Sequence, residues 1–243
     1  MSKIIQYLCG MSNGYILKCS NGYIAIDCGS EYDIGIFKNI LSENNISPEE
    51  IKLIIVTHGH CDHFVNADGM KKLTGAPLLC HKEAVLSLTT PLYPDVHARN
   101  AVGYKLLTEM TPDGEPCPIL PPVTPDIIIG NEDYDLSDYG INAKIIYTPG
   151  HSLGCISIIT SEREAFVGDI LQEKIPGCGF PPGVAYFTYT DDLEEANKLT
   201  FASCDRLLNE ADIFYSGHSG PFSRQDIVKC INEAKEEAKT FKL

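Results

Sequence analysis

Four side chains with the chemistry of metal ligands lie within six consecutive residues of the chain. They are His58, His60, Asp62 and His63, in a chain that has only seven histidines. Imidazole nitrogens and carboxylate oxygens bind zinc and similar divalent metals. Because residues two apart in an extended segment point the same way, His58 and His60 can bind one ion. Asp62 and His63 are displaced around the turn and can bind a second ion.

Three further candidate ligands follow apolar stretches later in the chain, and each has a glycine directly before it. They are His151, Asp169 and His218. Loops at one edge of a scaffold are where reactive side chains converge, so we expect these residues to join the first four. Two ions about 3.5–4 Å apart need a bridging group, and Asp169 is the candidate for that role. The seven residues together predict a site for two metal ions.

The elements that must position these ligands begin with a strand-rich stretch. The pattern predicts three strands over residues 3–29, a helix over 32–44, a strand over 51–56, a helix over 64–74, a strand over 77–81 and a short helix over 82–88. Asn21-Gly22 lies between two apolar runs, which is a strong hairpin signal. The first four ligands directly follow the strand over 51–56.

A second strand-rich stretch begins at residues 126–130. Strands are predicted over 141–147, 155–160, 164–169 and 213–215, and helices over 191–209 and 223–240. Asp191 or Asp192 can cap the first of these helices. Each half of the chain begins with strands and ends with helices, and this order predicts two packed sheets with helices outside them.

A proline-rich insertion separates the two halves. Residues 89–125 hold eight of the fifteen prolines, and one helix is predicted near residues 97–110. Long ordered loops in compact domains are often functional. We expect this insertion and the loop over 172–190 to select the substrate. The candidate contacts are His97, Tyr186 and Tyr189. Because no linker composition interrupts the chain, we expect a single domain over residues 1–243.

The composition narrows the class of protein. Hydrophobic residues make up 44% of the chain and charged residues 21%, which suits a soluble globular protein. No apolar run approaches the ~20 residues of a transmembrane helix, and the first residues do not resemble a secretory signal. The ten cysteines are scattered without a CxxC pair, so we expect free thiols in a cytoplasmic protein.

The charge balance narrows the expected partners. The formal net charge is -14, whereas nucleic-acid-binding proteins usually carry a basic patch. We therefore expect a small-molecule substrate, no nucleic acid and no membrane, with a homodimer as an option.

The order of the candidate residues resembles the metallo-β-lactamase-fold hydrolase superfamily. The family motif His-x-His-x-Asp-His is matched by His58, His60, Asp62 and His63. Further family positions are matched, in the family's order, by Asp27 at a strand end, His151 after Pro-Gly, Asp169 after Gly and His218 after Gly. The resemblance spans residues 27–218. It implies an α/β fold, a four-layer αβ/βα sandwich in which helices flank two mixed β-sheets and the metal site lies at one edge.

The resemblance also implies roles for the candidate residues. The first ion is expected on His58, His60 and His151, and the second on Asp62, His63 and His218. Asp169 is expected to bridge the ions together with a shared hydroxide. Asp62 and Asp169 are the candidate catalytic residues, because either carboxylate can take up a proton. Asp27 is expected to orient the ligands, although an ordinary turn acid is the alternative reading. We expect two divalent ions, zinc first, with iron or manganese as alternatives.

The full motif resembles the glyoxalase II-like and lactonase-like branches of the family. Only about 25 residues follow His218, so the helical glutathione-binding domain of glyoxalase II is not expected. We therefore expect a dinuclear metallohydrolase acting on a small ester, thioester or lactone. A phosphodiesterase or nuclease of the same fold is one alternative, and the acidic composition disfavours it. An iron-dependent, sulfur dioxygenase-like redox enzyme is another, and the complete second ligand set disfavours that.

Overall fold

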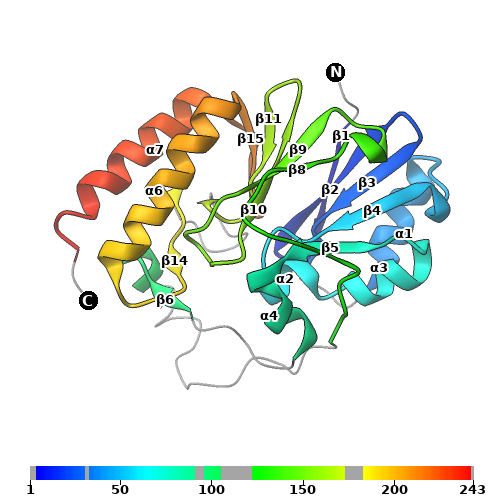
Figure 1. The fold of residues 1–243 in the computed structure, drawn as a ribbon, viewed down its shortest axis with the longest axis horizontal. Coiled ribbons are helices and arrows are strands. Elements are labelled where there is room, and N and C mark those ends of the chain that lie inside the picture. The colour runs from blue at the N-terminus through cyan, green and yellow to red at the C-terminus, as the bar shows by residue number, and fades with distance from the viewer. Residues whose placement is uncertain (1–3, 31–32, 91–95, 105–121, 173–182, 242–243) are drawn as a thin grey trace.

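The computed structural model describes residues 4–30, 33–90, 96–104, 122–172 and 183–241. Two six-stranded sheets pack against each other, and helices cover their outer faces (Figure 1). The sheet drawn mainly in blue to cyan and its helices come from the N-terminal part of the chain, apart from one green strand at residues 127–129, and the other sheet and its helices come from the C-terminal part (Figure 1). The predicted four-layer αβ/βα sandwich is confirmed.

The first sheet has the strand order β1-β2-β3-β4-β5-β7. Its strands are β1 (Ile4–Cys9), β2 (Ser12–Cys19), β3 (Gly22–Ile26), β4 (Ile51–Ile55), β5 (Leu78–His81) and β7 (Ile127–Ile129). The first three strands pair antiparallel, and β3, β4, β5 and β7 run parallel. Parallel neighbours need long crossover connections, and here those connections carry the helices.

The second sheet has the strand order β16-β15-β11-β10-β9-β8. Its strands are β8 (Tyr134–Asp135), β9 (Ala143–Tyr147), β10 (Ile156–Thr160), β11 (Glu164–Phe166), β15 (Ile213–Tyr215) and β16 (Phe222–Ser223). Two short ladders lie outside these sheets. They pair β12 (Leu171–Gln172) with β13 (Gly183–Val184), and β6 (His97–Ala98) with β14 (Phe187–Thr188).

The three longest helices in the described residues begin at residues whose side chains cap them. The α-helices are α1 (Ile34–Glu43), α2 (Cys61–Phe64), α3 (Ala67–Thr74), α4 (Val85–Thr89), α6 (Leu193–Glu210) and α7 (Arg224–Glu237). Short 3-10 turns are η1 (Pro48–Glu50), η2 (Lys82–Ala84) and η3 (Ser137–Tyr139). Asp192 accepts a hydrogen bond from the Glu195 amide at 3.1 Å, so the predicted cap of α6 is confirmed. Ser223 and Asp226 form a capping box at α7.

The core lies in three layers of apolar side chains. The central layer joins the inner faces of the two sheets, with Leu53 and Ile55 from β4 packed in the same cluster as Ile156 and Ile158 from β10. The two outer layers lie between each sheet and its helices. β4 is therefore buried on both faces, which explains why its sequence is a nearly continuous apolar run.

Three predictions about individual elements differ from the structure in whole or in part. Residues 127–129 were expected to open the second half, but β7 pairs with β5 and completes the first sheet. The helix predicted over 64–74 is two helices, and α2 begins at Cys61 inside the ligand motif. Residues 97–98 form strand β6 instead of a helix, because they pair with β14. Residues 101–104 are helical, and residues 105–110 lie outside the described part of the chain.

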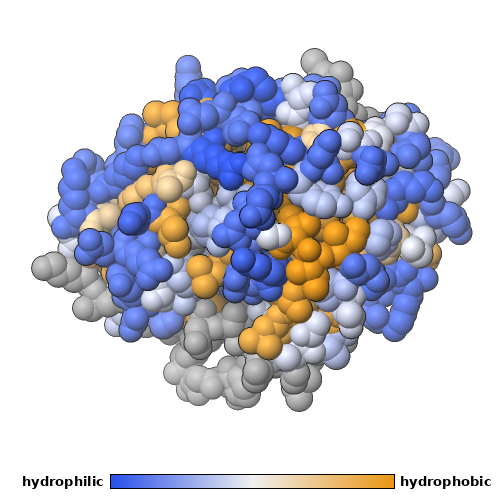
Figure 2. Space-filling model, in the orientation of Figure 1, coloured by the Kyte–Doolittle hydropathy of each residue, from blue (hydrophilic) through white to orange (hydrophobic). Residues whose placement is uncertain are grey.

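The face of the molecule drawn in Figure 2 is mainly polar. Hydrophilic residues cover most of the face in Figure 2, and an apolar patch lies near β5. Within the described ranges, no helix combines the length and the apolar character needed to cross a membrane.

Candidate metal centre

The candidate ligands stand at strand ends that meet along one edge of the sandwich. Residues 57–63 follow β4 in the first sheet, and His151, Asp169 and His218 follow β9, β11 and β15 in the second. The Ile156 amide donates to the Thr57 carbonyl at 2.9 Å, which joins the two sheets beside the motif. The structure thereby brings all seven predicted ligands into two adjoining groups.

The first group contains three imidazoles. His58, His60 and His151 each offer a ligand atom, and these atoms lie within 4.8 Å of one another. Nδ1 of His60 lies 3.1 Å from Nε2 of His58 and 2.7 Å from Nε2 of His151. All three residues are buried. Three converging imidazole nitrogens are a typical zinc ligand set that leaves a fourth position open.

The second group combines two imidazoles with two carboxylates. It contains Asp62, His63, Asp169 and His218. Nε2 of His218 lies 3.1 Å from Oδ2 of Asp62 and 3.0 Å from Oδ2 of Asp169. Nε2 of His63 lies 3.5 Å from Oδ2 of Asp62. These mixed nitrogen and oxygen donors suit zinc, iron or manganese.

Asp169 belongs to the second group and also faces the first. Its Oδ2 atom is 3.0 Å from Nε2 of His218 in the second group and 3.8 Å from Nε2 of His151 in the first. Its Oδ1 atom faces Nε2 of His63 at 3.3 Å. A carboxylate in this position can contact both groups at once.

Asp27 orients two ligands from outside the groups. Its carboxylate accepts hydrogen bonds from the amide and the hydroxyl of Thr57, both at 2.8 Å, and lies 2.8 Å from Nδ1 of His63. The Thr57 hydroxyl also lies 3.1 Å from Nδ1 of His58. These contacts suit the tautomers of His58 and His63 that carry the proton on Nδ1, and such tautomers leave Nε2 to bind a metal. Thr57 was not predicted, although it directly precedes the motif.

Strand β2 and the residue that precedes it hold the loop that carries His218. The Met11 carbonyl lies 2.8 Å from Nδ1 of His218, which directs Nε2 toward the two carboxylates. The Asn13 side chain donates to the carbonyls of Ser216 and Ser219, and the Tyr15 hydroxyl donates to Ser216 at 2.6 Å. These contacts join residues about 200 positions apart, and no pattern in the sequence predicted them.

Glycine is required at the point where this loop passes the centre. A Cβ atom on Gly217 would lie 2.2 Å from Oδ1 of Asp169 and 2.5 Å from Cε1 of His63. A side chain there would displace both candidate ligands. The Gly217 amide also donates to the Gly168 carbonyl at 2.8 Å, which ties the His218 loop to the Asp169 loop.

Burial and charge act differently on the two groups. Burial, with a smaller contribution from the neighbouring His60, lowers the pKa of His151 to about 3. Burial likewise lowers the pKa of His58 and of His60. Burial alone would lower the pKa of His218 too, but the carboxylates of Asp169 and Asp62 outweigh it and raise this pKa to about 10. Burial therefore favours neutral imidazoles in the first group, whereas the carboxylates of the second group favour a protonated His218.

The residues present fit divalent metal ions. Nε2 of His63, Nδ1 of His151 and Oδ1 of Asp169 are buried without a hydrogen-bond partner among the described residues. Buried polar atoms nearly always have a partner, so a nitrogen and an oxygen that face each other at 3.3 Å without one indicate a cation site. A divalent cation would also replace the protons that the carboxylates hold on the imidazoles.

Gln172 is a residue at the centre that sequence reasoning missed. Its side-chain amide donates to Oδ2 of Asp169 at 2.8 Å. Its position three residues after Asp169, as a polar residue following the buried Ile170 and Leu171, is the signal that could have identified it.

The structure gives the three candidate substrate residues different surroundings. Tyr186 is buried against Val102 and Phe187. The Tyr189 hydroxyl lies 3.2 Å from a carboxylate oxygen of Glu195 on α6. His97 lies in β6, half-buried and paired with Thr188. Substrate contact by these residues stays a prediction.

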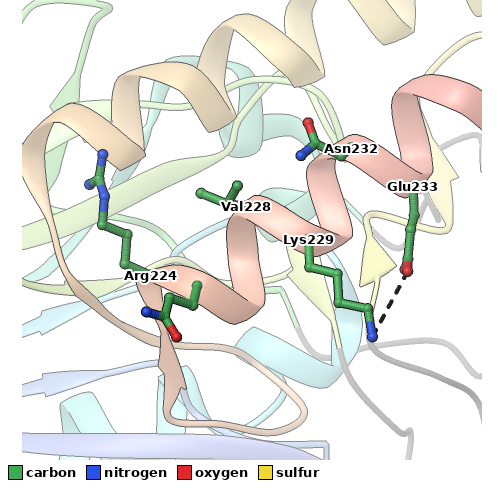
Figure 3. Close-up of a pocket in the computed structure, with 6 residues that line it drawn as sticks. Arg224, Val228, Lys229, Asn232 and Glu233 are labelled. Atoms are coloured by element: carbon green, nitrogen blue, oxygen red, sulfur yellow. Dashed lines mark ion pairs between the residues drawn. The ribbon is translucent and has the colours of Figure 1, made fainter.

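A separate hollow on the surface lies along α7 (Figure 3). It is lined by Arg224, Gln225, Val228, Lys229, Asn232 and Glu233. Lys229 and Glu233 form a long ion pair at 4.0 Å on this exposed face. None of the seven candidate ligands lines this hollow, so we assign the chemistry to the centre between the sheets.

The fold and the centre define a class of protein: a four-layer α/β sandwich with a metal-ligand cluster between its sheets. The family model for the metallo-beta-lactamase superfamily matches residues 7–218. The chain belongs to this superfamily, most members of which are hydrolytic metalloenzymes.

Two relatives carry functional names. A probable metallo-hydrolase from Methanocaldococcus jannaschii is 29% identical over 211 residues, which cover 85% of this chain and 87% of that protein. Hydroxyacylglutathione hydrolase GloC from Haemophilus influenzae is 30% identical over 135 residues, covering 55% of this chain and 56% of that protein. Uncharacterized relatives from Mycobacterium tuberculosis are 26% identical over 60% of their length.

Solved structures share the fold. The B3 metallo-beta-lactamase BLEG-1 superimposes with a TM-score of 0.67 at 21% identity, covering 94% of this chain and 97% of that chain. A metallo-beta-lactamase family protein from Thermus thermophilus gives a TM-score of 0.66 at 21% identity, covering 97% of this chain and 79% of that chain.

Proposed function

We propose that this protein is a hydrolase that uses two divalent metal ions and acts on a small ester, thioester or lactone. The observation that carries the proposal is the position of Asp169, with Oδ2 3.0 Å from His218 and 3.8 Å from His151. Under this proposal, the three imidazoles of the first group would hold the first ion. Asp62, His63 and His218 would hold the second, and Asp169 lies within reach of both groups.

The side chains have separate roles in the proposed reaction. Two bound divalent ions supply a water of lowered pKa and a Lewis acid for the substrate carbonyl. Asp169 holds the two halves of the centre together. The Asp62 side chain is 16% exposed, against 4% for Asp169, so Asp62 is better placed to exchange a proton with solvent. Asp27 and Thr57 keep the histidine rings in the orientation that binding requires.

Two observations favour a carbonyl substrate over a phosphodiester. The relative from Haemophilus influenzae is named for the hydrolysis of hydroxyacylglutathione, a thioester. The net charge of this chain is -14, which opposes the approach of a polyanion. Zinc is the proposed metal, with iron or manganese as alternatives. A cytoplasmic location and a homodimer stay predictions.

The proposal is tested by metal analysis and a substrate panel on the purified protein. We expect about two ions per chain, and turnover of at least one thioester, ester or lactone that ceases with a chelator and returns with zinc, iron or manganese. A single ion per chain would contradict the two-ion centre. Metal-dependent turnover of phosphodiesters alone would replace the carbonyl substrate with the phosphodiesterase alternative.

A further inference from the structure

Gln172 is a buried amide with both ends of its side chain engaged. It ends β12 and is 2% exposed. Its Nε2 atom donates to Oδ2 of Asp169 at 2.8 Å, and its Oε1 atom accepts from the Tyr186 amide at 3.0 Å. Because an amide has one donor end and one acceptor end, these two partners permit a single orientation of the side chain. The donor is therefore always directed at Asp169.

The Tyr186 backbone is itself held from the insertion side. The Arg99 amide donates to the Tyr186 carbonyl at 2.9 Å. The Arg99 guanidinium, which is 2% exposed, donates to the carbonyls of Val184 and Ala185 and to Oδ1 of Asn197. A planar guanidinium that donates to several acceptors holds them in fixed positions relative to one another. A continuous set of contacts thus runs from the insertion through Tyr186 and Gln172 to Asp169.

The two oxygens of Asp169 are not equivalent. Oδ2 receives the Gln172 amide and lies near both His151 and His218, whereas Oδ1 faces His63. A carboxylate can rotate about its last torsion, which is broad in energy. The Gln172 donor opposes this rotation by holding Oδ2 between the two groups, which directs Oδ1 toward His63.

We propose that Gln172 is a positioning residue that holds Asp169 for the ion of the second group. The inference rests on the proposed two-ion function. The first group keeps three imidazoles whatever Asp169 does, whereas Asp169 is one of only four ligands in the second. Loss of the Gln172 donor should therefore weaken binding of the second ion more than binding of the first. The contacts through Tyr186 and Arg99 make the insertion part of this support.

The test compares metal binding by wild type, Gln172→Met, Gln172→Leu and a control. Met keeps the length of the side chain and Leu keeps a buried apolar shape, and both remove the donor. The control is Thr160→Val, which changes a buried polar side chain at the far end of β10, where its hydroxyl contacts Glu164. Stepwise dissociation constants are measured with zinc in chelator buffers, and cobalt spectra follow the coordination of each ion.

We expect the Gln172 variants to bind the second ion about 10–100-fold more weakly, the range for loss of an outer partner of a ligand. Binding of the first ion should stay within about threefold of wild type, and Thr160→Val should bind both ions like wild type. Wild-type constants for both ions in the Gln172 variants, or an equal loss of both ions, would overturn the inference. A wild-type protein that binds fewer than two ions would instead overturn the proposed function. If either Gln172→Met or Gln172→Leu fails to fold, the metal dissociation constants of the other variant test the inference.

Discussion

Asp27 lies at the end of β3 with its carboxylate 2.8 Å from Nδ1 of His63, across 36 residues of sequence. The contact is fully buried. The same carboxylate accepts hydrogen bonds from the amide and the hydroxyl of Thr57, the residue directly before the ligand motif. One side chain therefore fixes both the start of the ligand loop and the ring of its last histidine. Asp27 has a positive φ of 57°, a conformation that Asp adopts more readily than most residues, so the local backbone is bent to reach this position.

Replacing Asp27 by Asn should weaken binding of the second ion. The amide group of Asn places a donor where Asp27 now accepts from Thr57 or His63, so one contact becomes repulsive. We expect a loss of zinc affinity of about 10–100-fold, measured by competition with a chelator. Asp33→Asn is the matched control, because Asp33 caps α1 on the exposed surface. Equal affinities for the two variants would remove Asp27 from the centre.

Replacing His58 by Ala should abolish turnover, whereas His81→Ala should not. His81 is also a buried histidine, but its ring stacks on the ring of Tyr147, with 4.5 Å between the ring centroids, and it lies in neither ligand group. Loss of a direct ligand should reduce kcat/KM by more than the roughly 10–100-fold expected for an outer partner. The metal content of His81→Ala should match wild type even if its thermal stability falls. Unchanged turnover in His58→Ala would reject the proposed centre.

The metal-free protein should lose stability as the pH rises from about 7 to 10. Burial opposes protonation of His218, but Asp169 and Asp62 outweigh burial and raise its pKa to about 10. A pKa above the unfolded value near 6.5 stabilises the fold below that value, and the effect is lost as the pH rises through the folded pKa. Bound metal displaces the proton, so this slope should disappear in the loaded protein.

Urea unfolding with and without chelator, at several pH values between 7 and 10, measures this difference. A metal-free protein whose free energy of unfolding stays level or increases over this range would contradict the ion pairs between His218 and the two carboxylates.

Replacing Arg99 by Met should destabilise the fold. The buried carbonyls of Val184 and Ala185 lose their donors, at a cost of about 2–3 kcal/mol in the free energy of unfolding. The matched control is Arg163→Met, whose guanidinium pairs with Asp212 on the exposed surface. Exposed ion pairs contribute little, so the control should change stability far less. Similar urea midpoints for the two variants would show that the hydrogen bonds of Arg99 do not stabilise the fold.

The Arg99 contacts were beyond sequence reasoning. The sequence shows residues 89–125 as a proline-rich insertion. Proline content predicts an irregular backbone, but it does not predict which other residues that backbone contacts. The pairing of β6 with β14 and the contacts of Arg99 join segments about 90 residues apart. No local pattern encodes a pairing at that separation. The same reason explains why β7 was assigned to the wrong half, because an isolated Ile-Ile-Ile strand fits either sheet.

The sequence by itself determined the fold class and which residues can bind metal. Apolar runs followed by glycine and histidine or aspartate mark strand ends that carry reactive loops, and the spacing of His58, His60, Asp62 and His63 is local. The family resemblance also implied how these residues divide between two ions, and only the tertiary structure decided the distances within each group and from Asp169 to both. It also revealed the supporting partners, among them Gln172 and Met11. Hydrogen bonds to a ligand come from whichever backbone or side chain the packing brings near, and packing between two sheets is not written in any short stretch of sequence.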